Sequence, residues 1–81
     1  MILKNAFIHS YPEGAQVAHG EIYGDQKGRF MDCTPVRTSR IIEIRKDQKN
    51  GKCYIDTMNS TYEIEYAEGA EIPEAHKEVE V

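Results

Sequence analysis

The residue types best suited to binding chemistry are concentrated in one basic stretch near the middle of the chain. Arg29 and Phe30 follow a glycine, and Arg37, Ser39 and Arg40 lie a few positions later. Guanidinium groups bind phosphate through paired hydrogen bonds, hydroxyls add further hydrogen bonds, and an aromatic ring can stack on a base. The stretch therefore suits a nucleotide or another planar anion. The alternative is a set of solvated arginines on an exposed strand face, with the phenylalanine in the core.

Two polar residues later in the chain extend this candidate site. Asn59 and Ser60 occupy a predicted turn before the last strand, so they would approach the ligand from the same end of the sheet. We expect the arginines to supply charge-assisted hydrogen bonds and the phenylalanine to supply a stacking surface. The predicted ligand-binding set is Arg29, Phe30, Arg37, Ser39, Arg40, Asn59 and Ser60.

No comparable pattern points to catalysis, a metal or a cofactor. His9, His19 and His76 lack metal-ligand spacing, and we interpret them as surface or half-buried structural residues. The sequence contains no nucleophile motif and no glycine-rich phosphate loop leading into a helix. We expect Cys33 and Cys53 to be reduced, partly buried thiols, with a single disulfide as the alternative. These observations predict a binding protein that is not an enzyme and uses no cofactor.

The charge of the chain is unevenly distributed. Its 81 residues make one domain whose core supplies little net stability, so we expect a homo-oligomer. The net charge is −4, but residues 27–52 carry eight bases and three acids, a net charge of +5. Residues 68–81 carry five acids and one base. The basic centre favours an anionic small-molecule partner, whereas the overall negative charge and few aromatic residues disfavour nucleic acid.

Nothing in the sequence indicates a membrane or secretory segment. No apolar run approaches the roughly 18 residues of a transmembrane helix. The first residues lack a basic leader and a cleavage site, and they are typical of a strand of the mature fold. We therefore expect no membrane partner and a cytoplasmic location.

Alternation of apolar and polar residues with a period of two predicts strands throughout the chain. In residues 61–66, Tyr62, Ile64 and Tyr66 share one face and the acids share the other. The adjacent Ile41 and Ile42 interrupt the alternation of another strand, which indicates a bulge or burial of both faces. We expect five strands, covering residues 1–9, 15–23, 36–46 with an entry through Thr34 and Pro35, 52–58 and 61–66.

Short turns between these strands predict an all-β fold. The connections are residues 11–14, 24–28, 47–51 and 59–60, and the Asn-Gly pair in the third is a strong hairpin signal. We expect a β domain over residues 1–67, either a small curved antiparallel sheet or a five-stranded barrel. An acidic tail follows over residues 68–81, either disordered or with a short helical turn at residues 74–79. Self-association would use a sheet edge or the strand at residues 53–58. The predicted core contains Phe7, Ile22, Ile42, Ile44, Ile55, Tyr62 and Ile64.

Three segments resemble a pattern found in small bacteriophage-encoded β proteins. They are Arg-Phe-Met-Asp at residues 29–32, Thr-Ser-Arg-Ile-Ile-Glu-Ile at residues 38–44, and Thr-Met-Asn-Ser-Thr-Tyr-Glu at residues 57–63. The set is similar to the Thoeris anti-defence sponge family, whose members capture cyclised ADP-ribose signals as homo-oligomers. The chain departs from that pattern at Cys33, where a glycine is usual, and at Met58, where a basic residue is usual.

These features give three hypotheses of different classes. The first, which the resemblance implies, is a phage sponge that holds a nucleotide-like signal in the cytoplasm of an infected bacterial host without turning it over. The second is a protein-binding inhibitor or adaptor that blocks a host defence enzyme through a strand edge or the acidic tail. The third is a small β domain with a role in assembly. We favour the first because it uses the basic centre of the chain.

Overall fold

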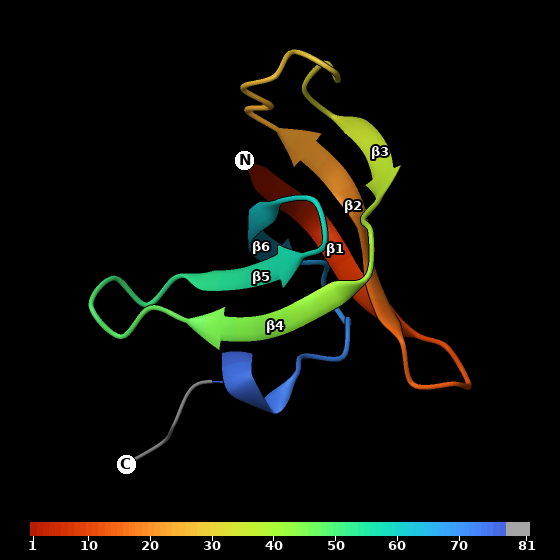
Figure 1. Ribbon diagram of the computed structural model, residues 1–81. Coiled ribbons are helices and arrows are strands. Elements are labelled where there is room, and N and C mark those ends of the chain that lie inside the picture. The colour runs from red at the N-terminus through yellow and green to blue at the C-terminus, as the bar shows by residue number, and fades with distance from the viewer. Residues whose placement is uncertain (78–81) are drawn as a thin grey trace.

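The chain forms a six-stranded sheet and one short 3-10 helix, and the computed structural model describes residues 1–77. The predicted all-β class is confirmed (Figure 1). No helix within these residues is long and apolar enough to cross a membrane. The elements are β1 (Ile2–Ser10), β2 (Gln16–Tyr23), β3 (Thr34–Arg37), β4 (Ile41–Lys46), β5 (Cys53–Thr57), β6 (Thr61–Tyr66) and η1 (Glu74–His76).

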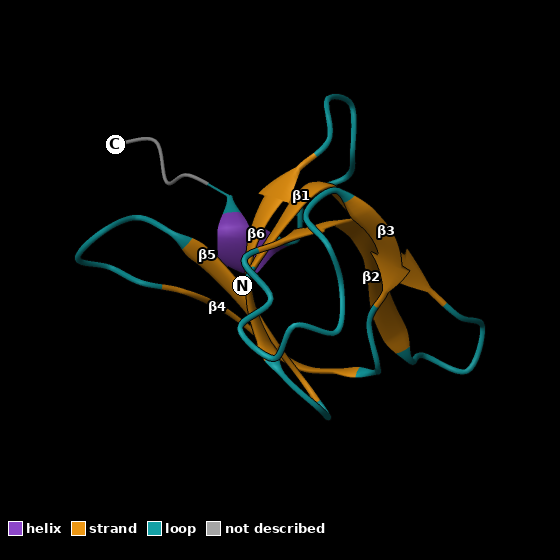
Figure 2. Ribbon diagram, turned by 90° about the horizontal axis from the view of Figure 1, so that it is seen from above, coloured by secondary structure: helices purple, strands orange, loops and turns teal. Residues whose placement is uncertain are grey.

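The strand expected at residues 36–46 is in fact two strands at opposite edges of the sheet. The strand order is β3-β2-β1-β6-β5-β4, so the chain passes from one edge to the other through residues 38–40. A link this short cannot span more than about 14 Å. The sheet must therefore curl until its edges approach each other (Figure 2). Because β3 and β4 are not paired in the described part of the chain, the sheet stays open and the five-stranded barrel does not form.

The sheet is mixed and not wholly antiparallel, because β1 pairs in parallel with β6. A bulge between Lys4 and Phe7 interrupts the pairing of β1 with β2, and Asn5 within it has a φ of +52°. Asparagine tolerates this left-handed backbone better than most residues. Gly20 of β2 lies against the same region, where an added Cβ would meet Leu3 Cγ at 2.8 Å. The close packing of β1 on β2 therefore depends on a residue without a side chain.

The core occupies the concave side of the curled sheet. Ile22, Ile55, Tyr62 and Ile64 are buried there as predicted, and Ile44 packs against them in a partly buried position. These side chains come from four strands, with Tyr62 and Ile64 on the same face of β6. The period-two pattern thus identifies most of the core.

Two predicted core residues are wrong, and a bulge explains each error. Phe7 is 46% exposed and Ile42 is 68% exposed. In a regular strand, Leu3 and Ala6 would point to opposite faces, because they are three positions apart. The β1 bulge brings both of them to the inner face and turns Phe7 outward. A second bulge, between Ile41 and Glu43, does the same to Ile42 and confirms the bulge predicted at the Ile41–Ile42 pair.

One buried histidine anchors the C-terminal segment to the sheet. η1 packs against β4 (Figure 1), and its last residue, His76, is 4% exposed. This position contradicts the interpretation of His76 as a surface or half-buried residue. His76 Nε2 lies 2.9 Å from the Arg45 carbonyl oxygen and 3.0 Å from the Tyr54 carbonyl oxygen, and Nδ1 lies 2.6 Å from the Tyr66 hydroxyl.

These contacts fix the orientation of the His76 ring. Carbonyl oxygens only accept hydrogen bonds, so Nε2 carries a proton and donates to them, while Nδ1 is hydrogen-bonded to the Tyr66 hydroxyl. Burial raises the pKa of the Tyr66 phenol, which keeps this hydroxyl protonated. η1 therefore belongs to the folded unit. Residues 78–81 of the predicted tail, including the end of its possible helical turn, lie outside the described residues.

The two cysteines are both free, and the expectation of partly buried thiols fits only one of them. Cys53 is partly buried, whereas Cys33 is exposed. The Cys33 backbone has a φ of +71°, in the left-handed region where a side chain costs roughly 1–2 kcal/mol. The Cys33 Sγ lies 2.8 Å from the Tyr23 hydroxyl, and this contact is the main reason that the pKa of Tyr23 rises to about 12.

Replacing Cys33 with glycine is expected to stabilise the protein. Glycine adopts the left-handed backbone without strain, and this relief should exceed the roughly 0.4–1 kcal/mol by which glycine favours the unfolded chain. Thermal unfolding should therefore give a higher midpoint for Cys33→Gly than for the wild type. Cys33→Ala is the matched control, because it removes the thiol and keeps the strained Cβ. A midpoint for the glycine variant at or below that of the alanine variant would contradict the interpretation.

Candidate functional site

A pocket opens where the chain crosses between the two edges of the sheet. Its volume is about 150 Å³, and five of the seven predicted ligand-binding residues line it. Arg40 and Ser60 are not part of the lining, although each is the sequence neighbour of a residue that is. We call this the concave pocket. Its lining consists of the predicted Arg29, Phe30, Arg37, Ser39 and Asn59, together with Ile22, Val36, Thr38 and Tyr62.

One carboxylate organises the loop that carries Arg29 and Phe30. The Asp25 side chain has no exposed surface, and its Oδ2 accepts the N–H of Arg29 at 2.8 Å and that of Phe30 at 3.1 Å. Its Oδ1 accepts the N–H of Lys27 at 3.2 Å. Burial would raise the pKa of Asp25, but the backbone donors and the Arg29 charge outweigh it and lower that pKa. The carboxylate therefore stays ionised at neutral pH and holds the loop in one conformation.

Thr38 fixes the segment that crosses the open end of the sheet. Its N–H donates to the Ala18 carbonyl oxygen at 2.8 Å, and its Oγ1 accepts the Ala18 N–H at 3.0 Å. The Thr38 hydroxyl donates to the Ser39 carbonyl oxygen at 2.8 Å. These bonds hold the end of β3 against β2 and then redirect the chain. They set the positions of Arg37 and Ser39 on either side.

A closed turn presents Asn59 to the pocket. The Thr57 N–H and the Thr57 hydroxyl both donate to the Ser60 carbonyl oxygen at 2.8 Å, and the Ser60 N–H donates to Thr57 Oγ1 at 3.1 Å. The Met58 N–H donates to the Arg40 carbonyl oxygen at 3.1 Å, which ties this turn to the crossing segment. The tight connection predicted at residues 59–60 is confirmed.

The positive charge of the concave pocket comes from two arginines. Its lining, all of it within residues 1–77, contains no carboxylate, but Arg29 is already paired with the neighbouring Asp25. The Arg29 guanidinium lies 5.7 Å from the centre of the Phe30 ring, and its Nε lies 3.6 Å from Asp25 Oδ2. Arg37 is exposed and forms no ion pair with any described residue. Its guanidinium is therefore available to an external anion through charge-assisted hydrogen bonds.

No family model, curated protein or solved structure matches the chain. Guanidinium, hydroxyl, amide and phenyl groups bind anions and planar rings. No lining residue is a histidine, cysteine or carboxylate, the groups that most often transfer protons in catalysis. No three metal-ligating side chains cluster anywhere in residues 1–77.

Four lining residues are missing from the predicted ligand set. Ile22 and Tyr62 were assigned to the core, and they form its last layer below the pocket. Val36 and Thr38 lie in the segment that was expected to continue as one strand. The break at residues 38–40 creates the pocket, and no turn-forming glycine, proline or asparagine marks it in the sequence.

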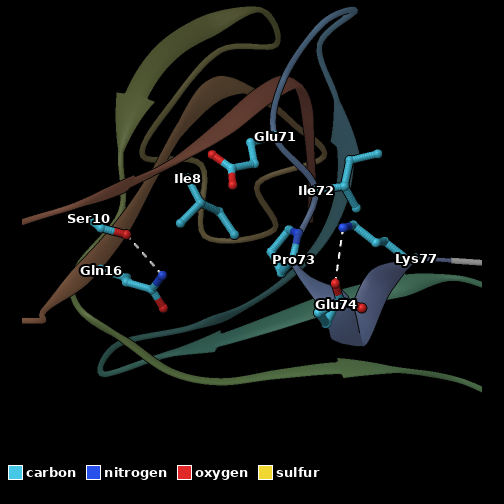
Figure 3. A pocket seen from close by; sticks show the side chains of 8 residues that line it. All are labelled: Ile8, Ser10, Gln16, Glu71, Ile72, Pro73, Glu74 and Lys77. Carbon is cyan, nitrogen blue, oxygen red and sulfur yellow. Dashed lines mark hydrogen bonds and ion pairs between the residues drawn. The ribbon is translucent and has the colours of Figure 1, made fainter.

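A second pocket, of about 230 Å³, lies between the β1–β2 hairpin and the C-terminal segment (Figure 3). Glu71, Glu74 and Lys77 line the side that belongs to the C-terminal segment. Lys77 Nζ lies 3.1 Å from Glu74 Oε1, so its charge is already neutralised (Figure 3). The remaining carboxylate repels an anion, and this pocket does not suit the predicted ligand.

Proposed function

We propose that the chain is a non-enzymatic binding protein that sequesters a nucleotide-like immune signal, as a phage anti-defence sponge does. The observation that carries the proposal is the convergence of Arg29, Phe30, Arg37 and Asn59 on one pocket without a carboxylate. These residues come from three separate segments of the chain. A phosphate can form charge-assisted hydrogen bonds with both guanidinium groups, and a base can stack on the phenyl ring. Sequestration in this way needs no acid-base group.

The resemblance to the sponge family supports the same function. Each of the three segments that carry it contributes residues to the concave pocket: Arg29 and Phe30 from the first, Ser39 from the second, and Asn59 from the third. Cys33, at the glycine position of the family, has the left-handed backbone that glycine favours. The family also implies a homo-oligomer in the cytoplasm of an infected bacterial host, which we include in the proposal.

Calorimetric titration of the protein against cyclic nucleotides and cyclised forms of ADP-ribose tests this proposal. We expect saturable binding of at least one of them. Arg29→Ala should weaken that binding roughly ten- to hundred-fold, because a hydrogen bond to a charged group contributes about 1.5–3 kcal/mol. Lys49→Ala is the matched control, since it removes one positive charge from the exposed β4–β5 turn and should change the affinity little. An equal loss in both variants would indicate nonspecific attraction by net charge.

A second candidate function is inhibition of a host protein by direct contact. Large apolar side chains on the surface favour it: Met31 is 84% exposed and Met58 is 67% exposed. Exposed methionines are common at adaptable binding surfaces. If the folded wild-type protein gives no heat with any nucleotide tested, this function replaces the first.

A further inference from the structure

The concave pocket is too small to enclose a whole nucleotide. Its volume is about 150 Å³, whereas sites that bury drug-sized ligands measure roughly 300–1,000 Å³. A nucleotide held by Arg29 and Phe30 must therefore extend beyond this pocket. Val36 and Arg37 of the edge strand β3 line both the concave pocket and a larger cavity, of about 440 Å³, which we call the outer groove. Arg37 thus belongs to both linings, and the volume of the outer groove falls within the range for a ligand site.

The outer groove contains an aromatic platform. The Phe7 and His19 rings are stacked, with their centroids 4.9 Å apart and their planes 9° from parallel. Phe7 is 46% exposed, so much of this ring faces solvent. The strand register places Phe7 of β1 opposite His19 of β2, and His19 opposite Arg37 of β3. The platform therefore leads directly to the arginine that the two cavities share.

Charge decides which part of a ligand occupies the outer groove. Glu21 lines it, and its carboxylate repels phosphate, so the anionic part of a ligand stays at Arg37. The Glu21 carboxylate and the amide of Asn5, which also lines the groove, can instead form hydrogen bonds with the amino groups and ring nitrogens of a base. A planar base that stacks on the free ring face of the Phe7–His19 pair satisfies both the stacking surface and these polar groups.

We propose that the ligand is a dinucleotide that bridges the edge strand β3. One base stacks on Phe30 in the concave pocket, the linking phosphate binds Arg37, and the second base stacks on the free face of the Phe7 ring, which His19 supports from the other side, in the outer groove. This inference rests on the proposed function, because it starts from a nucleotide in the concave pocket. A ligand with a single base leaves the aromatic platform of the outer groove unused.

Titration of the whole chain with the linear dinucleotide pApA and with AMP tests the inference. The second base should strengthen binding by about five- to hundred-fold, the usual gain from one stacked base. Phe7→Ala should abolish most of this difference and leave the affinity for AMP unchanged. Phe7→Leu removes the ring but keeps apolar bulk at this position, and it should behave in the same way. Agreement between the two variants would show that the loss does not come from misfolding. Ile42→Ala is the control, because Ile42 is a similarly exposed apolar residue on β4.

The outcomes separate this inference from the function on which it rests. Equal affinities for pApA and AMP, both weakened by Arg29→Ala, would overturn the dinucleotide and leave nucleotide binding intact. A preference for pApA that survives in both Phe7 variants would place the second base elsewhere and also overturn it. Absence of binding by either compound would reject the bridging ligand, and the broader titration of cyclic nucleotides would then decide the proposed function.

Discussion

Replacing Ile55 with alanine is expected to unfold a large fraction of the protein. Ile55 has no exposed surface and lies in β5 between Ile44 of β4 and Tyr62 of β6. Truncating a buried isoleucine to alanine costs about 2–5 kcal/mol, because apolar contacts are lost and a cavity remains. A core of this size rarely supplies more than roughly 3–5 kcal/mol in total. Urea denaturation should therefore show the Ile55→Ala protein near or beyond its midpoint without denaturant.

The matched control uses the same substitution at an exposed position. Ile42 is 68% exposed, so Ile42→Ala should change the free energy of unfolding by no more than about 0.5 kcal/mol. A loss below 1 kcal/mol for Ile55→Ala, or a similar loss in both variants, would contradict the assignment of the core to the concave side of the sheet.

Replacing Arg37 with alanine is expected to have the largest effect on ligand affinity. Arg37 lines both the concave pocket and the outer groove, and no described carboxylate pairs with it. Its guanidinium can form two parallel hydrogen bonds with a phosphate, each of which contributes about 1.5–3 kcal/mol. Calorimetry should show at least a roughly hundred-fold loss of affinity.

Two further variants distinguish this contact from charge alone. Arg37→Lys keeps the charge and loses the paired geometry, so it should recover only part of the affinity. Arg40→Ala removes an equal charge from a residue outside the lining of the concave pocket, and its effect should be the smaller of the two alanine variants. Identical losses for Arg37→Ala and Arg40→Ala would contradict the role given to Arg37. Because Arg37 is exposed, its removal should leave the unfolding midpoint unchanged.

Local sequence patterns predicted the strands and turns but not their arrangement. The Asn-Gly pair does form the β4–β5 hairpin, where the Asp47 N–H donates to the Lys52 carbonyl oxygen at 2.9 Å and Gly51 has a φ of +72°. Pro35 lies in β3, an edge strand, where its missing N–H is tolerated. The parallel pairing of β1 with β6 brings together the first and the last strand of the chain. Nothing local in the sequence encodes such a long-range contact.

The failures come from single residues that shift the strand register. The insertion at Asn5 moves every later side chain of β1 to the other face, which is why Phe7 lies outside the core. His76 was misjudged for a different reason, since its burial depends on carbonyl groups of β4 and β5 that are distant in sequence. Five of the seven residues of the predicted ligand-binding set line one pocket, and their role in binding stays a prediction. The other lining residues could not be foreseen, because the curl of the sheet decides which neighbours face the pocket.

Recovery of the ligand after binding tests most directly the claim that the chain sequesters a nucleotide without turning it over. The protein is incubated with the nucleotide that titration identifies, separated from free ligand, and denatured, and the released compound is analysed by mass spectrometry. The account predicts release of the unaltered nucleotide in a fixed ratio to the protein, and a much lower ratio for Arg37→Ala. Release of a cleaved or rearranged product by the wild-type protein would contradict it and would identify an enzyme instead.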